Sequence, residues 1–291
     1  MRRRGRLEEV MRRRADVFFS LEGAVIAGED PEAVHDMRVA SRQLQEVLGL
    51  AFADDPRTSE MVRVIRRARR AQSRVRDLDV MSARLLKMGK KADEEVRDLL
   101  RFATRELQSR RKRFHKKMVS GLEALNLRNL RTQVEGLQKG DGGGEDGPWV
   151  KSGKVLAVAR ALIEDRTEAF RNAVAVASET ALTEEFHRAR IAGKRLRYIL
   201  EASDELGFGH YRRRIARLRR IQQALGVWHD LEVLGEAMSK ILARREMVRK
   251  RLPLVRAGCD LMERLRMDKQ RQLKAFLSLT ENSCEADKER P

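Results

Sequence analysis

The chain has few of the residues that build strands, disulfide frameworks or membrane spans. Its 291 residues include two cysteines, five prolines and 4% aromatic residues. The two cysteines, Cys259 and Cys284, are too few for a disulfide framework, which favours a reducing cytoplasm. No apolar run reaches the ~18 residues of a membrane span, and the basic start Met1–Arg4 has no apolar signal core behind it. Since strand alternation and hairpin signals are also missing, we expect an all-α cytoplasmic protein.

Acidic residues are scarce relative to basic ones. The chain holds 63 Lys and Arg against 44 Asp and Glu, a formal net charge of +19. Arginine outnumbers lysine 48 to 15, and its planar guanidinium binds two oxygens of a phosphate or carboxylate at once. This composition predicts a polyanionic partner and no membrane partner.

The sequence repeats itself in order. Residues 34–44 return 152 positions later as 186–196, and residues 75–81 return 153 positions later as 228–234. A glycine-rich stretch lies between the copies, where it would stop any helix. We therefore predict an internal duplication, divided into a first repeat at 1–138, a linker at 139–149, a second repeat at 150–281 and a tail at 282–291.

Apolar residues three and four apart predict helices throughout both repeats. We expect each repeat to form a four-helix up-and-down bundle, so that the fold is two tandem bundles. The predicted helices cover residues 4–27, 31–52, 57–88 and 92–125 in the first repeat and 150–179, 183–205, 209–243 and 245–280 in the second.

The repeated helices carry cations on the face opposite their apolar residues. Cations three or four residues apart on a helix repel one another, and a bound anion would offset this repulsion. The neighbouring helix of each repeat has a second basic stripe, which would complete a groove for a string of phosphates. The alternative is an ordinary solvated face. The candidate phosphate ligands are His35, Arg38, Arg42, Arg66, Arg67, Arg70, His187, Arg190, Lys194, Arg197, Arg219 and Arg220.

Two acidic motifs follow the basic stripes. Asp77-Leu78-Asp79-Val80 and Asp230-Leu231-Glu232-Val233 stand at matching places in the two repeats. We expect Asp77 and Asp230 to cap a helix turn or to orient an arginine. The sequence offers no catalytic residue, metal site or cofactor site.

The segments 35–44 and 187–198, together with the two Asp-Leu-acid-Val motifs, resemble the CHAD family, the conserved histidine α-helical domain. This resemblance implies paired four-helix bundles whose basic surface binds inorganic polyphosphate and brings the protein to polyphosphate granules. It also implies that the candidate ligands above contact phosphate. Gln43 and Gln45 stand where family members often have arginine, which predicts weaker binding by the first repeat. No Glu-x-Glu-x-Lys signature of a triphosphate-tunnel domain occurs, so we expect a stand-alone member without triphosphatase activity.

Two other functions stay open. The same charge would attract nucleic acid, although two tryptophans and two tyrosines offer few stacking platforms. A metal-dependent phosphohydrolase is suggested by the dipeptides His35-Asp36 and His229-Asp230. Such centres need several converging His and Asp ligands, and the helical period directs Asp36 away from His35.

Overall fold

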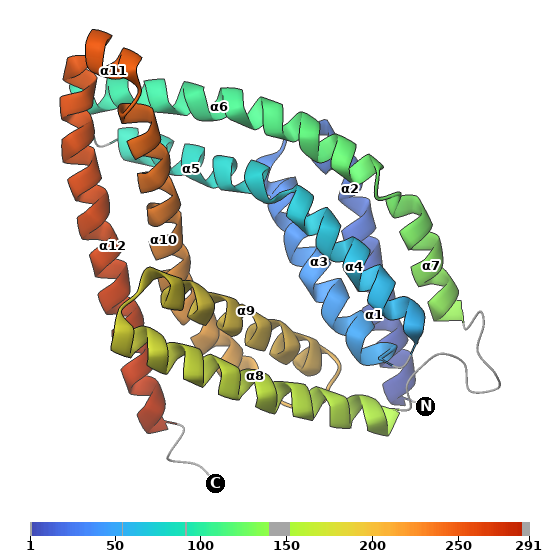
Figure 1. Cartoon of the computed structure of the whole chain (residues 1–291). Coiled ribbons are helices and arrows are strands. Elements are labelled where there is room, and N and C mark those ends of the chain that lie inside the picture. Colours follow the sequence, from blue (N-terminus) through green and yellow to red (C-terminus); the bar gives the residue numbers. More distant parts are fainter. Residues whose placement is uncertain (1, 54, 91, 140–151, 287–291) are drawn as a thin grey trace. The chain divides into compact units, whose positions relative to one another are not determined.

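The protein is helical throughout the residues that its computed structural model describes, which are 2–53, 55–90, 92–139 and 152–286 (Figure 1). The predicted linker lies outside these residues except for Lys139. The all-α prediction is confirmed. The elements are α1 (Arg2–Ser20), α2 (Glu22–Ala27), α3 (Pro31–Ala51), α4 (Pro56–Ala71), α5 (Ser73–Gly89), α6 (Glu94–Glu123), α7 (Leu127–Lys139), α8 (Ser152–Thr180), α9 (Thr183–Glu205), α10 (Arg212–Leu242), α11 (Arg245–Lys250) and α12 (Leu252–Ala286).

The helices form two compact units, and each unit draws on both halves of the sequence. Unit 1 comprises Met1–Arg76, Phe114–Arg171 and Lys194–Ala216, and unit 2 comprises Asp77–Arg113, Asn172–Gly193 and Arg217–Pro291. Helices α5, α6, α8, α9 and α10 contribute residues to both units. The division into tandem repeats at 1–138 and 150–281 therefore remains a proposal about the sequence.

Some predicted helices are interrupted. The predicted helix 57–88 is α4 and α5, separated at Gln72, whose buried Nε2 donates to the Ala68 carbonyl. The predicted helix 245–280 is α11 and α12, separated at Arg251. Helix α7 was not predicted at all. It begins after Asn126, which adopts φ 47° and caps the new helix by accepting from the Asn129 amide at 3.1 Å.

Unit 1 is built around α3, which packs against α1, α2 and α4 (Figure 1). An aspartate followed by a proline starts both α3 (Asp30 and Pro31) and α4 (Asp55 and Pro56). Each aspartate side chain accepts a hydrogen bond from the backbone amide two residues later. Each proline suits the first helical position because its nitrogen has no hydrogen to be satisfied. The predicted apolar face of α3 is buried. The opposite face of α3 carries the predicted cations.

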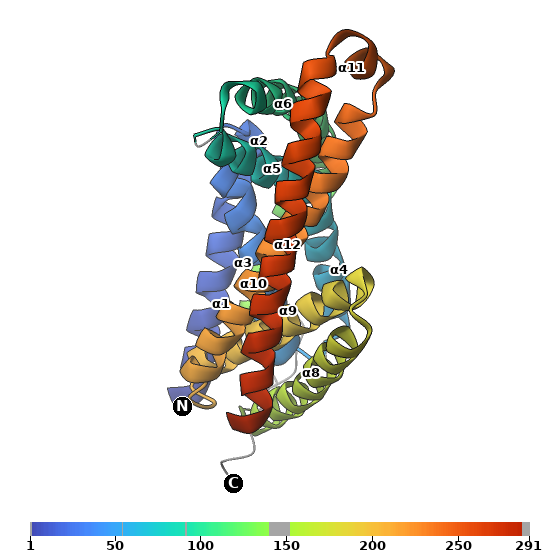
Figure 2. The same cartoon turned by 90° about the vertical axis from the view of Figure 1, so that its left-hand side faces the viewer.

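Unit 2 contains most of α5, the first part of α6, and the hairpin of α10 and α12, whose end carries α11 (Figure 2). The rings of Trp228 and Phe276 both meet Phe186 edge to face, at centroid distances of 5.5 and 5.7 Å. All three rings are buried. Among the described residues, no helix is long and apolar enough to cross a bilayer.

Candidate anion-binding site

Four arginines of unit 1 gather on one side of α3 and α4. We call Arg38, Arg42, Arg66 and Arg69 the arginine cluster. Arg38 crosses from α3 and donates through Nη1 to the Arg69 carbonyl at 2.6 Å and to the Ser73 hydroxyl at 3.0 Å. Arg42 Nη1 lies 3.4 Å from the Arg38 carbonyl. The first two arginines of the cluster therefore bind neutral backbone and hydroxyl oxygens.

The side-chain amide of Gln45 links the cluster together. Its Oε1 accepts from Arg66 Nε at 3.4 Å and from both terminal nitrogens of Arg69 at 3.3 Å. Arg69 Nη1 also lies 3.4 Å from the Ser41 hydroxyl. Gln45 accepts these hydrogen bonds without neutralising charge, although the charges of Arg66 and Arg69 also reach the buried Glu46 carboxylate, which is hydrogen-bonded to Arg166.

Arg69 is partly buried and surrounded by like charges. Burial and then the charges of Arg42, Arg38 and Arg66 lower the pKa of Arg69 to about 10. The group still carries its proton at neutral pH. Crowding of like charges nevertheless costs free energy that a bound anion would offset. Arg69 is not among the residues predicted from the sequence, because the helical projection of α4 places it beside the core face and does not show that α3 lies across from it.

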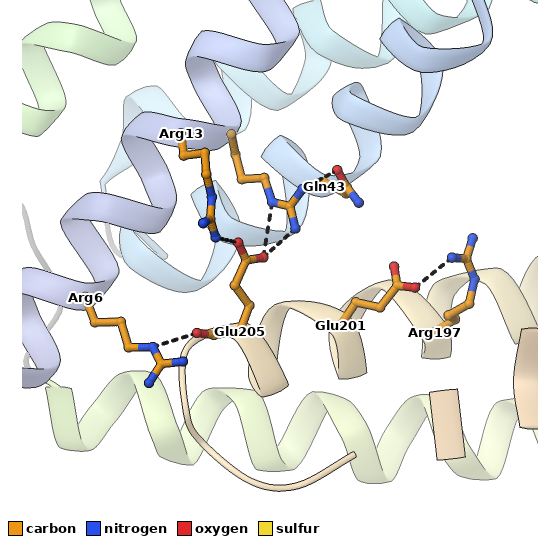
Figure 3. Close-up of polar contacts among 7 residues, drawn as sticks. Arg6, Arg13, Gln43, Arg197, Glu201 and Glu205 are labelled. Atoms are coloured by element: carbon orange, nitrogen blue, oxygen red, sulfur yellow. Dashed lines mark hydrogen bonds and ion pairs between the residues drawn. The ribbon is translucent and has the colours of Figure 1, made fainter. Parts of the chain in front are cut away.

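We call residues 34–46 the first motif and their counterpart at 186–198 the second motif. A tyrosine from the second motif lies beside the arginine cluster. The guanidinium carbon of Arg197 is 4.4 Å from the Tyr198 ring centroid, and that of Arg42 is 5.7 Å from it. Arg197 also pairs with Glu201 at 2.8 Å (Figure 3). The second motif therefore contributes Arg197 and Tyr198 to unit 1, together with Lys194.

The end of α9 is held against α1 by a charged network (Figure 3). Arg13 and Arg14 both bind the Glu205 carboxylate, and Arg6 Nε donates to the Glu205 carbonyl at 2.7 Å. Arg14 also donates to Gln43 at 2.6 Å. Gln43 and Gln45, noted as departures from the family pattern, thus hold arginines that come from other helices.

His35 lies half-buried on α3, in surroundings that disfavour its protonated form. Burial, followed by the charge of Arg76, lowers the pKa of the imidazole, although Glu32 and Asp36 act in the opposite direction. An anion beside the ring would favour the protonated form. The ligand atoms of Glu32, His35 and Asp36 lie within 4.8 Å of one another. Asp36 follows His35 about 100° around the helix, yet a carboxylate oxygen and a ring nitrogen of the two residues still come this close.

Unit 2 holds the other part of the second motif. The rings of His187 and His229 are 5.3 Å apart between centroids. Arg190 is half-buried, and Arg219 and Arg220 are exposed. Gln222, at the position that matches Arg69, donates to the Gly193 carbonyl at 2.7 Å. In unit 1, Arg67 and Arg70 are exposed on α4. The structure thus divides the predicted ligands between the two units.

The acidic motifs make structural ion pairs through their second acid. Asp79 on α5 binds Arg111 Nε of α6 at 2.5 Å, with only 4% of the Asp79 side chain exposed. At the matching position, Glu232 of α10 binds Lys269 of α12. Both ion pairs lie in unit 2. The Asp79 pair joins the first acidic motif to α6, and the Glu232 pair joins the second acidic motif to α12. The role predicted from the sequence concerned the first acid of each motif, Asp77 or Asp230, and not the second acids that make these ion pairs.

The described part of the chain thus combines an all-helical fold with arginines clustered on a repeated motif. The CHAD domain model matches residues 9–239, and the chain belongs to this family. The chain is similar to the crystal structure of the CHAD domain from the plant Ricinus communis, with a TM-score of 0.65, 21% identity, and coverage of 94% of this chain and 90% of that one. It is also similar to PptA from Streptomyces chartreusis, with a TM-score of 0.65, 15% identity, and coverage of 95% and 98%. No curated protein sequence matches it.

Proposed function

We propose that the protein binds inorganic polyphosphate without catalysing a reaction on it. The observation that carries this proposal is the arginine cluster, in which Arg66 and Arg69 share the neutral acceptor Gln45. Elsewhere the chain neutralises exposed arginines with carboxylates one helical turn away, as in Arg101–Asp98 and Arg266–Glu263. Arg42, Arg66 and Arg69 outnumber the nearby Glu46 carboxylate, so the cluster is suited to an external anion with many phosphates.

Further cations support the same proposal. Membership of the CHAD family agrees with a polyphosphate ligand, and we propose that this binding brings the protein to polyphosphate granules. His35, Arg67 and Arg70 in unit 1 and His187, Arg190, Arg219 and Arg220 in unit 2 would contact further phosphates. We also propose that the two motifs descend from one duplicated four-helix bundle, since the acids at 79 and 232 make matching ion pairs.

A nucleic acid is the alternative partner, and the burial of Trp228 and Tyr198 argues against it. Trp228 is 2% exposed and Tyr198 is 5% exposed, so neither ring offers a free face on which a base could stack.

A competition assay distinguishes these partners. The protein is bound to labelled long-chain polyphosphate, and unlabelled polyphosphate, single-stranded DNA or double-stranded DNA is added at equal phosphate concentration. We expect polyphosphate to displace the label at least ~10-fold more effectively than either DNA, and the affinity to fall steeply with added salt as counterions are released. Equal displacement by DNA would instead favour the nucleic-acid function, and failure of the protein to bind polyphosphate would remove the proposal.

A further inference from the structure

Tyr198 occupies a special place beside the arginine cluster. It lies on α9, in the second motif, and is 5% exposed. Its ring contacts Arg197 of the same motif and Arg42 of the first motif, at 4.4 and 5.7 Å from the ring centroid. The ring thus contacts one candidate phosphate ligand from each motif, and both of these arginines lie in unit 1.

An aromatic ring holds a guanidinium differently from a carboxylate. The negative face of the ring attracts the cation, but the ring carries no net charge to neutralise it. By contrast, the buried Glu46 carboxylate binds Arg166 at 2.8 Å and cancels its charge. Arg42 on Tyr198 is therefore oriented while its full positive charge stays available to an anion.

The duplicated motif gives this tyrosine a counterpart for comparison. With the 152-residue offset, the position that matches Tyr198 in the first motif is Glu46. One copy therefore places an ion-pairing acid at this position and the other an aromatic platform.

We propose that Tyr198 is a positioning residue for polyphosphate binding, which presents Arg42 to the anion while Arg197 stays paired with Glu201. The second motif would thereby contribute a residue to the arginine cluster, whose arginines come from α3 and α4. This inference rests on the proposed function, because it concerns the ligand that the arginine cluster would hold.

The test compares Tyr198→Phe with Tyr198→Leu in the full chain, using long-chain polyphosphate as the probe. The Phe variant keeps the ring face, so its affinity should stay within about 2-fold of wild type. The Leu variant removes the ring, and its affinity should fall about 5- to 10-fold. Its salt dependence should also become shallower by about one released ion, because Arg42 no longer engages a phosphate. Tyr211→Leu removes a tyrosine that lies elsewhere in unit 1 and should change neither quantity.

The possible failures are distinguishable. If wild type does not bind polyphosphate, the proposed function fails. If wild type binds and Tyr198→Leu binds equally well, or if Tyr198→Phe loses as much as Tyr198→Leu, only the role of Tyr198 is overturned. Should Tyr198→Leu lose its helical circular dichroism, Arg42→Lys replaces it as the test, because lysine keeps the charge but stacks poorly. An unchanged affinity and salt dependence in Arg42→Lys would overturn the inference.

Discussion

Replacing Arg42, Arg66 and Arg69 together with glutamine should weaken polyphosphate binding by about 100-fold. A hydrogen bond to a charged group contributes about 1.5 kcal/mol or more, or roughly 10-fold in affinity for each arginine. Residues in contact are not additive, so we expect less than the full product. Titration of labelled polyphosphate at fixed salt measures the loss. Glutamine suits this test because Gln222 already stands at the position that matches Arg69 and bonds to a backbone carbonyl.

The matched control removes the same charge from other places. Arg101, Arg266 and Arg271 are exposed, and each pairs with a carboxylate three residues away. Changing these three to glutamine should weaken binding less than about 3-fold, since screened exposed charges contribute little. If both triple variants lose the same affinity, net charge alone explains binding and the arginine cluster has no special role.

The second large effect concerns stability. Asp79→Ala should lower the free energy of unfolding by about 3 to 5 kcal/mol, because it leaves the Arg111 guanidinium in a mostly buried place without its carboxylate. Denaturant unfolding followed by circular dichroism measures the change. A loss of this size is a large share of the 5 to 15 kcal/mol that ordinarily stabilises a folded protein.

The duplication supplies the comparison for this variant. Glu232 and Lys269 form the matching pair, but their side chains are 27% and 32% exposed. Glu232→Ala should therefore cost about 1 kcal/mol or less. The double variant Asp79→Leu with Arg111→Met should recover most of the stability lost in Asp79→Ala, since it leaves no unpaired buried charge. Similar losses in Asp79→Ala and Glu232→Ala would contradict the assignment of Asp79 as the buried partner.

Helix positions followed from the sequence where local signals were strong. The predicted helix 183–205 has the same bounds as α9, and 31–52 differs from α3 by one residue. The break at Gln72 escaped prediction because no glycine or proline marks it. Helix α7 escaped because its start depends on the left-handed backbone of Asn126, which asparagine adopts only in some contexts.

Some members of the arginine cluster could be recognised from the sequence and others could not. Helical spacing identified Arg38, Arg42 and Arg66, because cations opposite an apolar face must point away from the core. It could not identify Arg69, Gln45 or Tyr198, whose roles come from contacts between α3, α4 and α9. It also could not show that the second motif divides, with Lys194 and Arg197 in unit 1 and His187 and Arg190 in unit 2. Such contacts depend on tertiary packing, and a periodic pattern reports only one helix at a time.

The central claim is that the arginine cluster holds phosphate. A crystal structure of the full chain with a short linear polyphosphate tests it most directly. We expect phosphate oxygens within hydrogen-bond distance of Arg42 and Arg69, with Tyr198 still stacked on Arg42. Phosphates bound only to other cations, such as Lys112 and Lys116 of α6, with none at the arginine cluster, would contradict the account.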